Sequence, residues 1–331
     1  PSWFFDIQSQ KDKMLAENET INWVPSHLKD GRFKNTILSA PDWNLSRDRY
    51  WATPIPVWKG KRTDGTEVIK AFGSYDEFEA STGVRLEDYH LPNVLDVTFE
   101  YDGVTMHHIG KVLDCWFESG SMPFAQFHYP FENKEKFEQN YPGDFITEYV
   151  AQTRAWFYYM HVMGVGLFGE KSFKNVISHG TLAGNDGRKM SKSFGNYTEP
   201  TVLYDEISAD AWRVFLLTSP FMNGEDVDLL DKDVALMERK LNMLYNTYDF
   251  FTMYASVDNY EAEYGKVPSS ENPMDRWILS KLQGVIKSAA DGMDAFVLND
   301  ATRPMIEFLD DLSNWFVRRS RKRFWKSEND G

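Results

Sequence analysis

One segment near the middle of the sequence constrains the fold more than any other. Residues 145–147 form a short strand-like run that ends at Glu148 and leads directly into an apolar stretch of helical length at 149–167. A second buried strand-like run follows at 175–179, and then a glycine-rich loop at 184–195. The order strand, helix, strand and loop is typical of a parallel sheet with helices packed on it. The sequence therefore predicts an α/β fold in this segment.

The residues before this segment predict a β-rich region. A hairpin is expected at 60–70, because the Asp-Gly pair in its middle suits a tight turn between short strands. A short polar helix is expected at 75–90, and further short strands at 91–120. Cys115 is the only cysteine, which excludes a disulfide framework and a cysteine-based zinc site in this chain. We expect Cys115 to be a small buried hydrophobic residue.

After residue 205 the chain is predicted to be a helical bundle. Apolar residues recur there at spacings of three and four, which marks one face of each of three helices. A polar linker at 256–273 separates the first helix from the other two. The three predicted stripes are Leu230, Val234, Met237, Leu241, Leu244, Tyr248 and Phe251; Ile278, Leu282, Val285, Ala289, Met293 and Phe296; and Ala301, Met305, Phe308, Leu312 and Trp315.

The composition is that of a globular protein. Of the 331 residues, 42% are hydrophobic and 26% are charged, and the length suits two or three domains. No apolar run is long enough to span a membrane, and no secretory leader is recognisable, so a cytoplasmic protein is expected. The chain begins at Pro1 without a methionine and stops at Gly331, just after a basic run. We therefore expect a piece of a longer polypeptide.

The glycine-rich loop carries the strongest chemical information. It has the sequence GNDGRKMSKSFGN and places two lysines, Lys189 and Lys192, beside two hydroxyl groups, Ser191 and Ser193. Glycines let a backbone approach a ligand closely, and ammonium groups stabilise the developing charge of a polyphosphate. The alternative is a solvated basic hairpin tip with no ligand.

K-M-S-K-S at 189–193 resembles the second signature of the class I aminoacyl-tRNA synthetases. Three segments are similar to those of the isoleucyl, leucyl and valyl subgroup: RDRYWATPIPVW at 47–58, VLDCWFESGSMPFAQ at 112–126 and GDFITEYVAQTRAWFYYM at 143–160. The segment at 112–126 has a form closest to isoleucyl enzymes. Two more resemble the start of the anticodon-binding helical domain of that family: DRWILSKL at 275–282 and DDLSNWFVRRSRKRFW at 310–325.

The resemblance implies a fold. It is an α/β protein with a Rossmann-like parallel sheet half-domain and a β-rich insertion, followed by an α-helical bundle. The implied domains are a post-editing segment with a connective insertion at 1–142, the second half of the Rossmann core with the KMSKS loop at 143–204, a helical stem-contact region at 205–270, and the start of the anticodon-binding domain at 271–331.

The resemblance also implies an activity. Such enzymes form an aminoacyl adenylate from an amino acid and ATP with Mg²⁺, and then transfer the acyl group to tRNA. Here the implied amino acid is isoleucine and the implied partner is tRNA-Ile, with no metal held by the protein and no membrane or protein partner. Lys192 would stabilise the pyrophosphate-side charge in the transition state, and Lys189 would support it.

Several residues are expected to bind ATP or the adenylate: Glu148, Gln152, His179, Ser191 and Lys192. Glu148, at the carboxyl end of a strand, fits the usual place for ligands in open α/β sheets. Gln152 lies four residues on, one helical turn away, and so could face the same ligand. The alternatives are that Glu148 is a first-turn helix residue favoured by the helix dipole, and that His179 is a buried histidine with satisfied hydrogen bonds.

Trp116 and Trp156 match the two tryptophans that wall the aliphatic amino-acid pocket of isoleucyl enzymes. A flat indole suits a branched alkyl chain, although without the resemblance both would be ordinary core residues.

The chain departs from the family pattern at four positions: Tyr149, Ala151 and Ala155 in the segment E-G-x-D-Q-x-R-G-W-F, and Ala52 in Y-W-G. The family's aspartate at position 151 contacts the ribose, so ribose binding is either lost or shifted to Glu148 and Gln152. One alternative is therefore a non-catalytic tRNA-binding or structural relative with a decayed adenylate site. A valyl- or leucyl-tRNA synthetase is the other.

The first family signature, H-x-G-H, is absent, so we expect this chain alone to hold half of the nucleotide site and to be inactive by itself. His107-His108-Ile109-Gly110 is a false match, because it lies in the β-rich region. Gly164 to Gly169 has the form G-x-G-x-x-G, but a dinucleotide fingerprint opens a helix and this one ends a helix.

A basic run at 318–326 contrasts with the net charge of −14. A local basic face, more than net charge, decides contact with nucleic acids. On a helix Arg318, Arg321 and Lys322 share one face, and we predict that they contact tRNA phosphates while Trp315 points inward. The alternative is a solvated helix end whose arginines pair with Glu307, Asp310 and Asp311.

Overall fold

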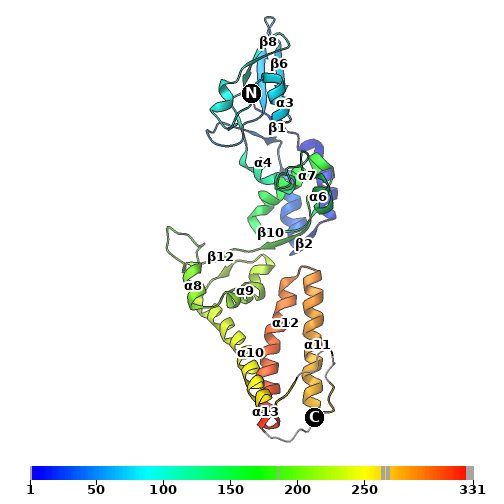
Figure 1. Cartoon of the computed structure of the whole chain (residues 1–331), viewed down its shortest axis with the longest axis vertical. Helices are drawn as coiled ribbons and strands as arrows, with labels where there is room; N and C mark the ends of the chain where they lie inside the picture. Colours follow the sequence, from blue (N-terminus) through cyan, green and yellow to red (C-terminus); the bar gives the residue numbers. More distant parts are fainter. Residues whose placement is uncertain (1, 185, 262–264, 266–268, 326–331) are drawn as a thin grey trace. The chain divides into compact units, whose positions relative to one another are not determined.

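The structure is a computed structural model that describes residues 2–184, 186–261, 265 and 269–325. The chain forms two compact units (Figure 1). Of the described residues, unit 1 comprises 2–22, 27–146 and 151–174. Unit 2 comprises 23–26, 147–150 and the described residues from 175 onward.

A three-stranded parallel sheet has the strand order β10-β11-β2, with β2 at Asn22–Val24, β10 at Gly143–Tyr149 and β11 at Phe173–His179. Between β10 and β11 the chain forms the 3-10 turn η4 (Val150–Arg154) and the helix α7 (Trp156–Phe168). The predicted α/β fold is confirmed.

The predicted boundary between the first strand and the helix is wrong. β10 continues to Tyr149, and α7 begins at Trp156 rather than at Tyr149. The residues between them, which include Gln152, Thr153 and Arg154, form the 3-10 turn η4. Such a turn at a helix start is not separated from the α-helix by the sequence pattern.

Most of helix α7 is buried within unit 1, and only its last turn, at Gly166 and Leu167, is exposed. Gly164 and Gly166 lie inside it, and a Cβ on Gly164 would come within 2.3 Å of the hydroxyl oxygen of Ser172. The helix ends at Gly169, whose φ of 76° is left-handed. These glycines therefore serve close packing and a helix end, as the sequence indicated.

The β-rich part of unit 1 is a four-stranded sheet in the order β6-β5-β8-β7. The predicted hairpin is confirmed as β5 (Val57–Lys61) and β6 (Glu67–Ala71), with Gly65 at a φ of 89° in the turn. Trp58 is the centre of the core, and the rings of Phe72, Phe78 and Phe99 surround it. The strands β7 and β8 are Phe99–Tyr101 and Val104–His108.

The helix predicted at 75–90 is shorter in the structure. It is α3 (Tyr75–Thr82), which starts at the capping side chain of Ser74 and stops at Gly83, where φ is 72°. The other elements of unit 1 are β1 (Phe4–Phe5), η1 (Gln8–Gln10), α1 (Lys11–Glu19), η2 (Lys29–Phe33), α2 (Lys34–Ser39), β3 (Trp43–Asn44), β4 (Ser46–Arg47), η3 (Asn93–Asp96), β9 (Val112–Leu113), α4 (Cys115–Gly120), α5 (Met122–Ala125) and α6 (Lys134–Asn140).

Unit 2 is helical apart from its strand ends and one small parallel pair, and the predicted bundle is confirmed. The long helices α10 (Asp231–Val257), α11 (Pro273–Asp294) and α12 (Leu298–Asp310) dominate it in Figure 1. The remaining elements are β12 (Leu182–Ala183), α8 (Pro200–Glu206), α9 (Ala209–Thr218), η5 (Pro220–Asn223), β13 (Val227–Asp228), η6 (Asp311–Val317) and α13 (Arg318–Trp325).

The predicted stripes are only partly buried in unit 2. Val234 on α10 and Ala301 on α12 are fully buried, whereas Tyr248 is 64% exposed. Trp315 is 53% exposed, so its predicted inward orientation is wrong. The physical reason is η6, which is a π-helical turn: its wider turn rotates the following residues, and Val317 takes the buried place.

Among the described residues, no helix is both long enough and apolar enough to cross a membrane.

Candidate functional site

Glu148 and His179 lie at the carboxyl ends of neighbouring parallel strands. Glu148 is the penultimate residue of β10, and His179 is the last residue of β11. The backbone N–H of Tyr149 donates to the carboxylate of Glu148 at 3.1 Å. The ring of His179 stacks on Phe221 with a centroid separation of 4.4 Å, and its Nδ1 lies 2.9 Å from the carbonyl oxygen of Gly180. This edge of a parallel sheet is where ligands of α/β proteins usually bind.

The glycine-rich loop leaves the strand β12 in unit 2. Lys189 forms a β-bridge with Ala183, and the N–H of Gly184 donates to the carbonyl oxygen of Arg188 at 2.7 Å. A Cβ on Gly184 would lie 2.1 Å from the carbonyl oxygen of Asn196, so this position requires glycine. The two ends of the loop are therefore in direct contact.

Asn196 holds the loop together, and the sequence analysis missed it. Its Oδ1 accepts the backbone N–H of Ser191 at 2.9 Å, and its Nδ2 donates to a carboxylate oxygen of Asp186 at 2.9 Å. The amide also lies within 3.3 Å of the carbonyl oxygens of Arg188 and Lys189. The available sequence clue was the Gly195-Asn196 pair, because both residue types are typical of turns. In the structure Gly195 has a φ of 56°.

Asp186 is the charged centre of this network. Hydrogen bonds from the Asn196 side chain and from Arg188 lower the pKa of Asp186 to about 2. Arg188 also forms an ion pair with Asp186 at 2.6 Å, and its guanidinium lies over the ring of Phe194. The Arg188 side chain is thereby bound within the loop, whereas the side chains of Lys189 and Lys192 take no part in this network.

Lys189 and Lys192 are exposed, and the described residues offer neither of them an ion pair. The ammonium group of Lys189 lies 5.7 Å from the centroid of the ring of Tyr149, which is the residue after Glu148 in the sequence. The hydroxyls of Ser191 and Ser193 are 2.8 Å apart. A closed loop with two unpaired ammonium groups at the carboxyl end of β10 can bind a polyphosphate and stabilise its charge.

Gln152 does not share a helix face with Glu148, so that expectation is corrected. Glu148 is in a strand and belongs to unit 2, whereas Gln152 is in the 3-10 turn η4 and belongs to unit 1. The amide oxygen of Gln152 accepts the backbone N–H of Trp156 at 2.9 Å, which caps the start of α7. Ala151, the most consequential departure from the family pattern, is exposed in the same turn.

Trp116 and Trp156 lie on two helices of unit 1 that pack together, α4 and α7. Trp116 is stacked on Tyr159, with centroids 5.5 Å apart and planes 12° apart. The Nε1 of Trp156 donates to the carbonyl oxygen of Ser119 at 3.0 Å. Both indoles are half-buried, which is compatible with the wall of a pocket.

Asp114 positions Trp116, and the sequence analysis did not single it out. It is 3% exposed and accepts the backbone N–H of Trp116 at 2.9 Å. It also forms an ion pair with Arg47 and accepts the Nε1 of Trp43 at 3.3 Å. The neighbouring Cys115 is exposed, so the prediction of a buried cysteine is wrong. The start of α4 turns its first residue outward, because Asp114 rather than Cys115 occupies the interior.

The histidine pair in the β-rich region has a structural role. His108 is buried, and its Nε2 lies 2.9 Å from the carbonyl oxygen of Ile55, while its Nδ1 accepts the N–H of Gly110 at 3.1 Å. Burial lowers the pKa of His108. No group of three or more metal-binding side chains is present in the part of the chain that the structure describes.

The predicted basic face lies on α13, where Arg318, Arg321 and Lys322 are exposed. Two of the three acidic residues proposed as their alternative partners are engaged elsewhere: Asp310 lies 3.8 Å from Lys240, and Asp311 lies 3.0 Å from Lys281.

The other basic residues of this run have structural contacts. Arg323 forms a two-fold ion pair with Asp275 at 2.6 and 2.9 Å, and Arg319 lies over the ring of Trp315. Lys326 is outside the described residues. Arg318 and Lys322 have no ion pair with any described residue, so their charge is available to a ligand.

Comparisons with known proteins identify the family of this chain. The family described as tRNA synthetases class I (I, L, M and V) matches residues 1–228, and the anticodon-binding domain of tRNA ligase matches residues 275–331. A methionyl-tRNA synthetase of Mycobacterium tuberculosis, solved in complex with methionyl-adenylate, covers 99% of this chain with a TM-score of 0.68 and 19% identity, and 55% of that structure is matched. A LeuRS of Agrobacterium radiobacter K84, solved with tRNA and LeuAMS, covers 83% of this chain with a TM-score of 0.61 and 19% identity, and 36% of that structure is matched.

Curated relatives include the isoleucine–tRNA ligases of Treponema denticola and Chlamydia abortus. They are 43% and 44% identical over 100% and 98% of this chain. The chain spans 31% of the length of each of them. With the family match over residues 1–228, the strand ends and the K-M-S-K-S loop, the conclusion is that this chain belongs to the class I tRNA synthetases.

Proposed function

We propose that this chain is part of an isoleucine–tRNA ligase, which activates isoleucine with ATP to isoleucyl-adenylate and transfers the isoleucyl group to tRNA-Ile. The observation that carries the proposal is the K-M-S-K-S loop at the carboxyl end of β10, where the ammonium group of Lys189 lies over the ring of Tyr149. Identity of 43% to an isoleucine–tRNA ligase over the whole chain supports isoleucine as the substrate. The four domains that the resemblance implies, at 1–142, 143–204, 205–270 and 271–331, are part of this proposal.

The loop would bind the phosphates of ATP. Lys192 and Lys189 stabilise the charge that develops on the pyrophosphate side, and the hydroxyl of Ser191 supplies a hydrogen bond. Mg²⁺ usually binds through the phosphates of its nucleotide and one or two carboxylates, so it would arrive with ATP. Glu148 and His179 would bind the nucleoside side, because both lie at the same end of the sheet as the loop.

The amino-acid side would be formed in unit 1. Trp116 and Trp156 would wall the pocket for the branched alkyl chain of isoleucine. Gln152 keeps its amide NH₂ for the adenylate, since its oxygen is already bound by Trp156. The exposed face of α13 would contact tRNA phosphates, and the whole protein would act in the cytoplasm.

A second candidate is a tRNA-binding relative with a decayed adenylate site. Ala151 favours it, because an alanine cannot replace the hydrogen bonds of an aspartate to a ribose. The two candidates differ in isoleucine-dependent ATP–pyrophosphate exchange by the full-length protein. Only the ligase shows exchange, and the 331-residue chain alone should show little.

In the full-length protein, Lys192→Ala should slow adenylate formation by about 100-fold or more, with little change in isoleucine binding. The control is Lys134→Ala, which removes an exposed lysine from α6. An unchanged rate for Lys192→Ala would remove this residue from the mechanism. Absence of exchange in the unmodified protein would favour the second candidate.

A further inference from the structure

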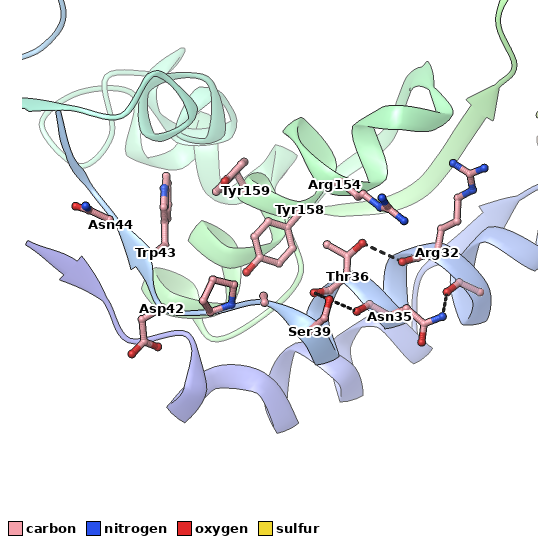
Figure 2. A pocket seen from close by; sticks show the side chains of 13 residues that line it. Arg32, Asn35, Thr36, Ser39, Asp42, Trp43, Asn44, Arg154, Tyr158 and Tyr159 are labelled. Carbon is pink, nitrogen blue, oxygen red and sulfur yellow. Dashed lines mark hydrogen bonds between the residues drawn. The ribbon is translucent and has the colours of Figure 1, made fainter. Parts of the chain in front are cut away.

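A cavity of about 760 Å³ lies in unit 1, and none of the residues assigned above to ATP or isoleucine lines it. Its floor is the π-helical turn η2 and the helix α2, and its other side is formed by Trp43, Arg154 and Tyr158 (Figure 2). π-helical turns are rare and occur often at functional positions. Arg32 is part of this turn.

The hydroxyl donors of Thr36 and Ser39, and one of the two amide N–H donors of Asn35, are used within α2 and the turn before it. Asn35, Thr36 and Ser39 each donate to a backbone carbonyl oxygen of the same helical segment, at 2.5, 2.9 and 2.7 Å. The carboxylate of Asp42 accepts the backbone N–H groups of Ile7 and Gln8. The polar part of the cavity is therefore dominated by groups that have no such internal partners.

Arg32 and Arg154 are the two charged donors of the cavity. Both are exposed, and neither forms an ion pair or hydrogen bond through its guanidinium with any described residue. In Figure 2 the two guanidinium groups lie at the same end of the cavity. Paired guanidinium groups are the preferred protein ligands of phosphate groups.

Tyr158 adds a neutral donor. Its side chain is 5% exposed, it lines the cavity, and its hydroxyl has no hydrogen-bond partner among the described residues. Burial raises the pKa of Tyr158, so the hydroxyl keeps its proton at neutral pH. The hydroxyl oxygen is the accessible tip of this otherwise buried side chain, so it can donate to a ligand in the cavity.

The wall beside Tyr158 excludes stacking of a base as the main interaction. Trp43 is 4% exposed, its ring is packed against Tyr159 with centroids 4.5 Å apart, and its Nε1 donates to Asp114. It has no free face for a nucleobase. The donors thus suit the backbone of a nucleic acid rather than its bases.

We propose that this cavity binds the phosphodiester backbone of an RNA strand. Arg32 and Arg154 contact a phosphate group, and the hydroxyl of Tyr158, which points away from them in Figure 2, donates to the backbone further along the strand. The inference rests on the proposed function, because that function brings an RNA to this chain. It adds a phosphate contact in unit 1 to the basic face on α13. No base-specific hydrogen bond is part of it, so the contact is indifferent to sequence.

The test uses the 331-residue chain and a fluorescein-labelled single-stranded RNA oligonucleotide, followed by fluorescence anisotropy over a range of salt concentrations. The double variant Arg32→Ala/Arg154→Ala should bind the RNA about tenfold or more weakly. Its salt slope should fall by about 0.7 if one phosphate contact is lost. Tyr158→Phe should weaken binding several-fold with an unchanged melting temperature, because the ring and its packing remain.

The matched control is Arg62→Ala/Arg85→Ala, which removes the same charge from exposed residues whose ion pairs lie within the β-rich part of unit 1. It should leave RNA binding nearly unchanged. Equal binding by the cavity variant and the wild type overturns the inference, and so does a wild-type chain that binds no RNA. If the cavity variant loses only inorganic phosphate, measured by calorimetry, the ligand is a free phosphate and the phosphodiester assignment is wrong.

The same measurements separate this inference from the proposed function. RNA binding that depends on α13 but not on the cavity contradicts the cavity and leaves the ligase proposal standing. A cavity that binds RNA in a full-length protein without isoleucine-dependent exchange contradicts the ligase activity and supports the cavity.

Discussion

The ammonium group of Lys189 lies 5.7 Å from the ring centroid of Tyr149, which joins the K-M-S-K-S loop to the end of β10. Tyr149 stands where the family pattern has glycine, and a glycine has no ring. A cation held over an aromatic face at an exposed position gains about 0.5–1 kcal/mol. The departure at Tyr149 therefore gives the loop lysine a contact at the carboxyl end of β10.

Replacing Tyr149 should accordingly change how well the loop is held. In the full-length protein, Tyr149→Leu should raise the KM for ATP about two- to fivefold, whereas Tyr149→Phe should behave like the wild type. Tyr245→Leu, at an exposed tyrosine of α10, is the control. Equal losses for Tyr149→Phe and Tyr149→Leu would show that the hydroxyl, not the ring, matters.

Asn196 should control the order of the loop. Asn196→Ala removes hydrogen bonds to Ser191 and Asp186, and each is worth about 1 kcal/mol. Hydrogen exchange at the amide of Ser191 should become roughly tenfold faster, with little change in overall stability. Asn140→Ala is a matched control, because the Asn140 amide donates only to a carbonyl of its own helix. Unchanged exchange at Ser191 would show that other contacts hold the loop.

His161 should make the stability of unit 1 depend on pH. It is fully buried, and burial lowers the pKa of His161 from 6.5 to about 4, although its Nε2 hydrogen bond to the carbonyl oxygen of Met14 opposes the shift. The unfolded chain gains a proton near pH 6.5 and the folded chain only near pH 4. The contribution is therefore complete above pH 6.5 and is lost as the pH falls toward 4.

The size of this loss is on the order of 3 kcal/mol, and urea unfolding followed by tryptophan fluorescence should measure it. His161→Gln should flatten the pH dependence of the unfolding free energy in this window. His128→Gln should not, because His128 is exposed. The same slope in wild type and His161→Gln would assign the dependence to other groups.

The face on α13 should contribute a salt-sensitive part of tRNA binding. Replacing Arg318, Arg321 and Lys322 together with alanine should weaken tRNA binding by the full-length protein and flatten its salt dependence, with isoleucine activation nearly untouched.

Arg321 lies over the ring of Phe250, so the triple variant also loses a packing contact. The double variant Arg318→Ala/Lys322→Ala keeps that contact and should show most of the effect. Arg62→Ala/Arg85→Ala is the charge-matched control. Wild-type affinity and salt slope in the double variant would make these residues structural.

Local sequence determined several features directly. The Asp-Gly pair set the turn between β5 and β6, because Gly65 can adopt a φ of 89°. Asn272 and Pro273 marked the start of α11, where the Asn272 side chain caps the N–H of Met274. The K-M-S-K-S loop and the two strand ends were also evident, since turn residues and short apolar runs act over a few residues.

Tertiary structure decided the rest, because it depends on contacts between residues far apart in the sequence. The position of the Trp156 indole depends on Ser119, whose carbonyl oxygen accepts the indole N–H across a separation of 37 residues. The outward position of Trp315 depends on a π-helical turn that periodicity alone does not reveal. The cavity brings Arg32 and Arg154 together from two segments, and only packing can place two such cations on one cavity.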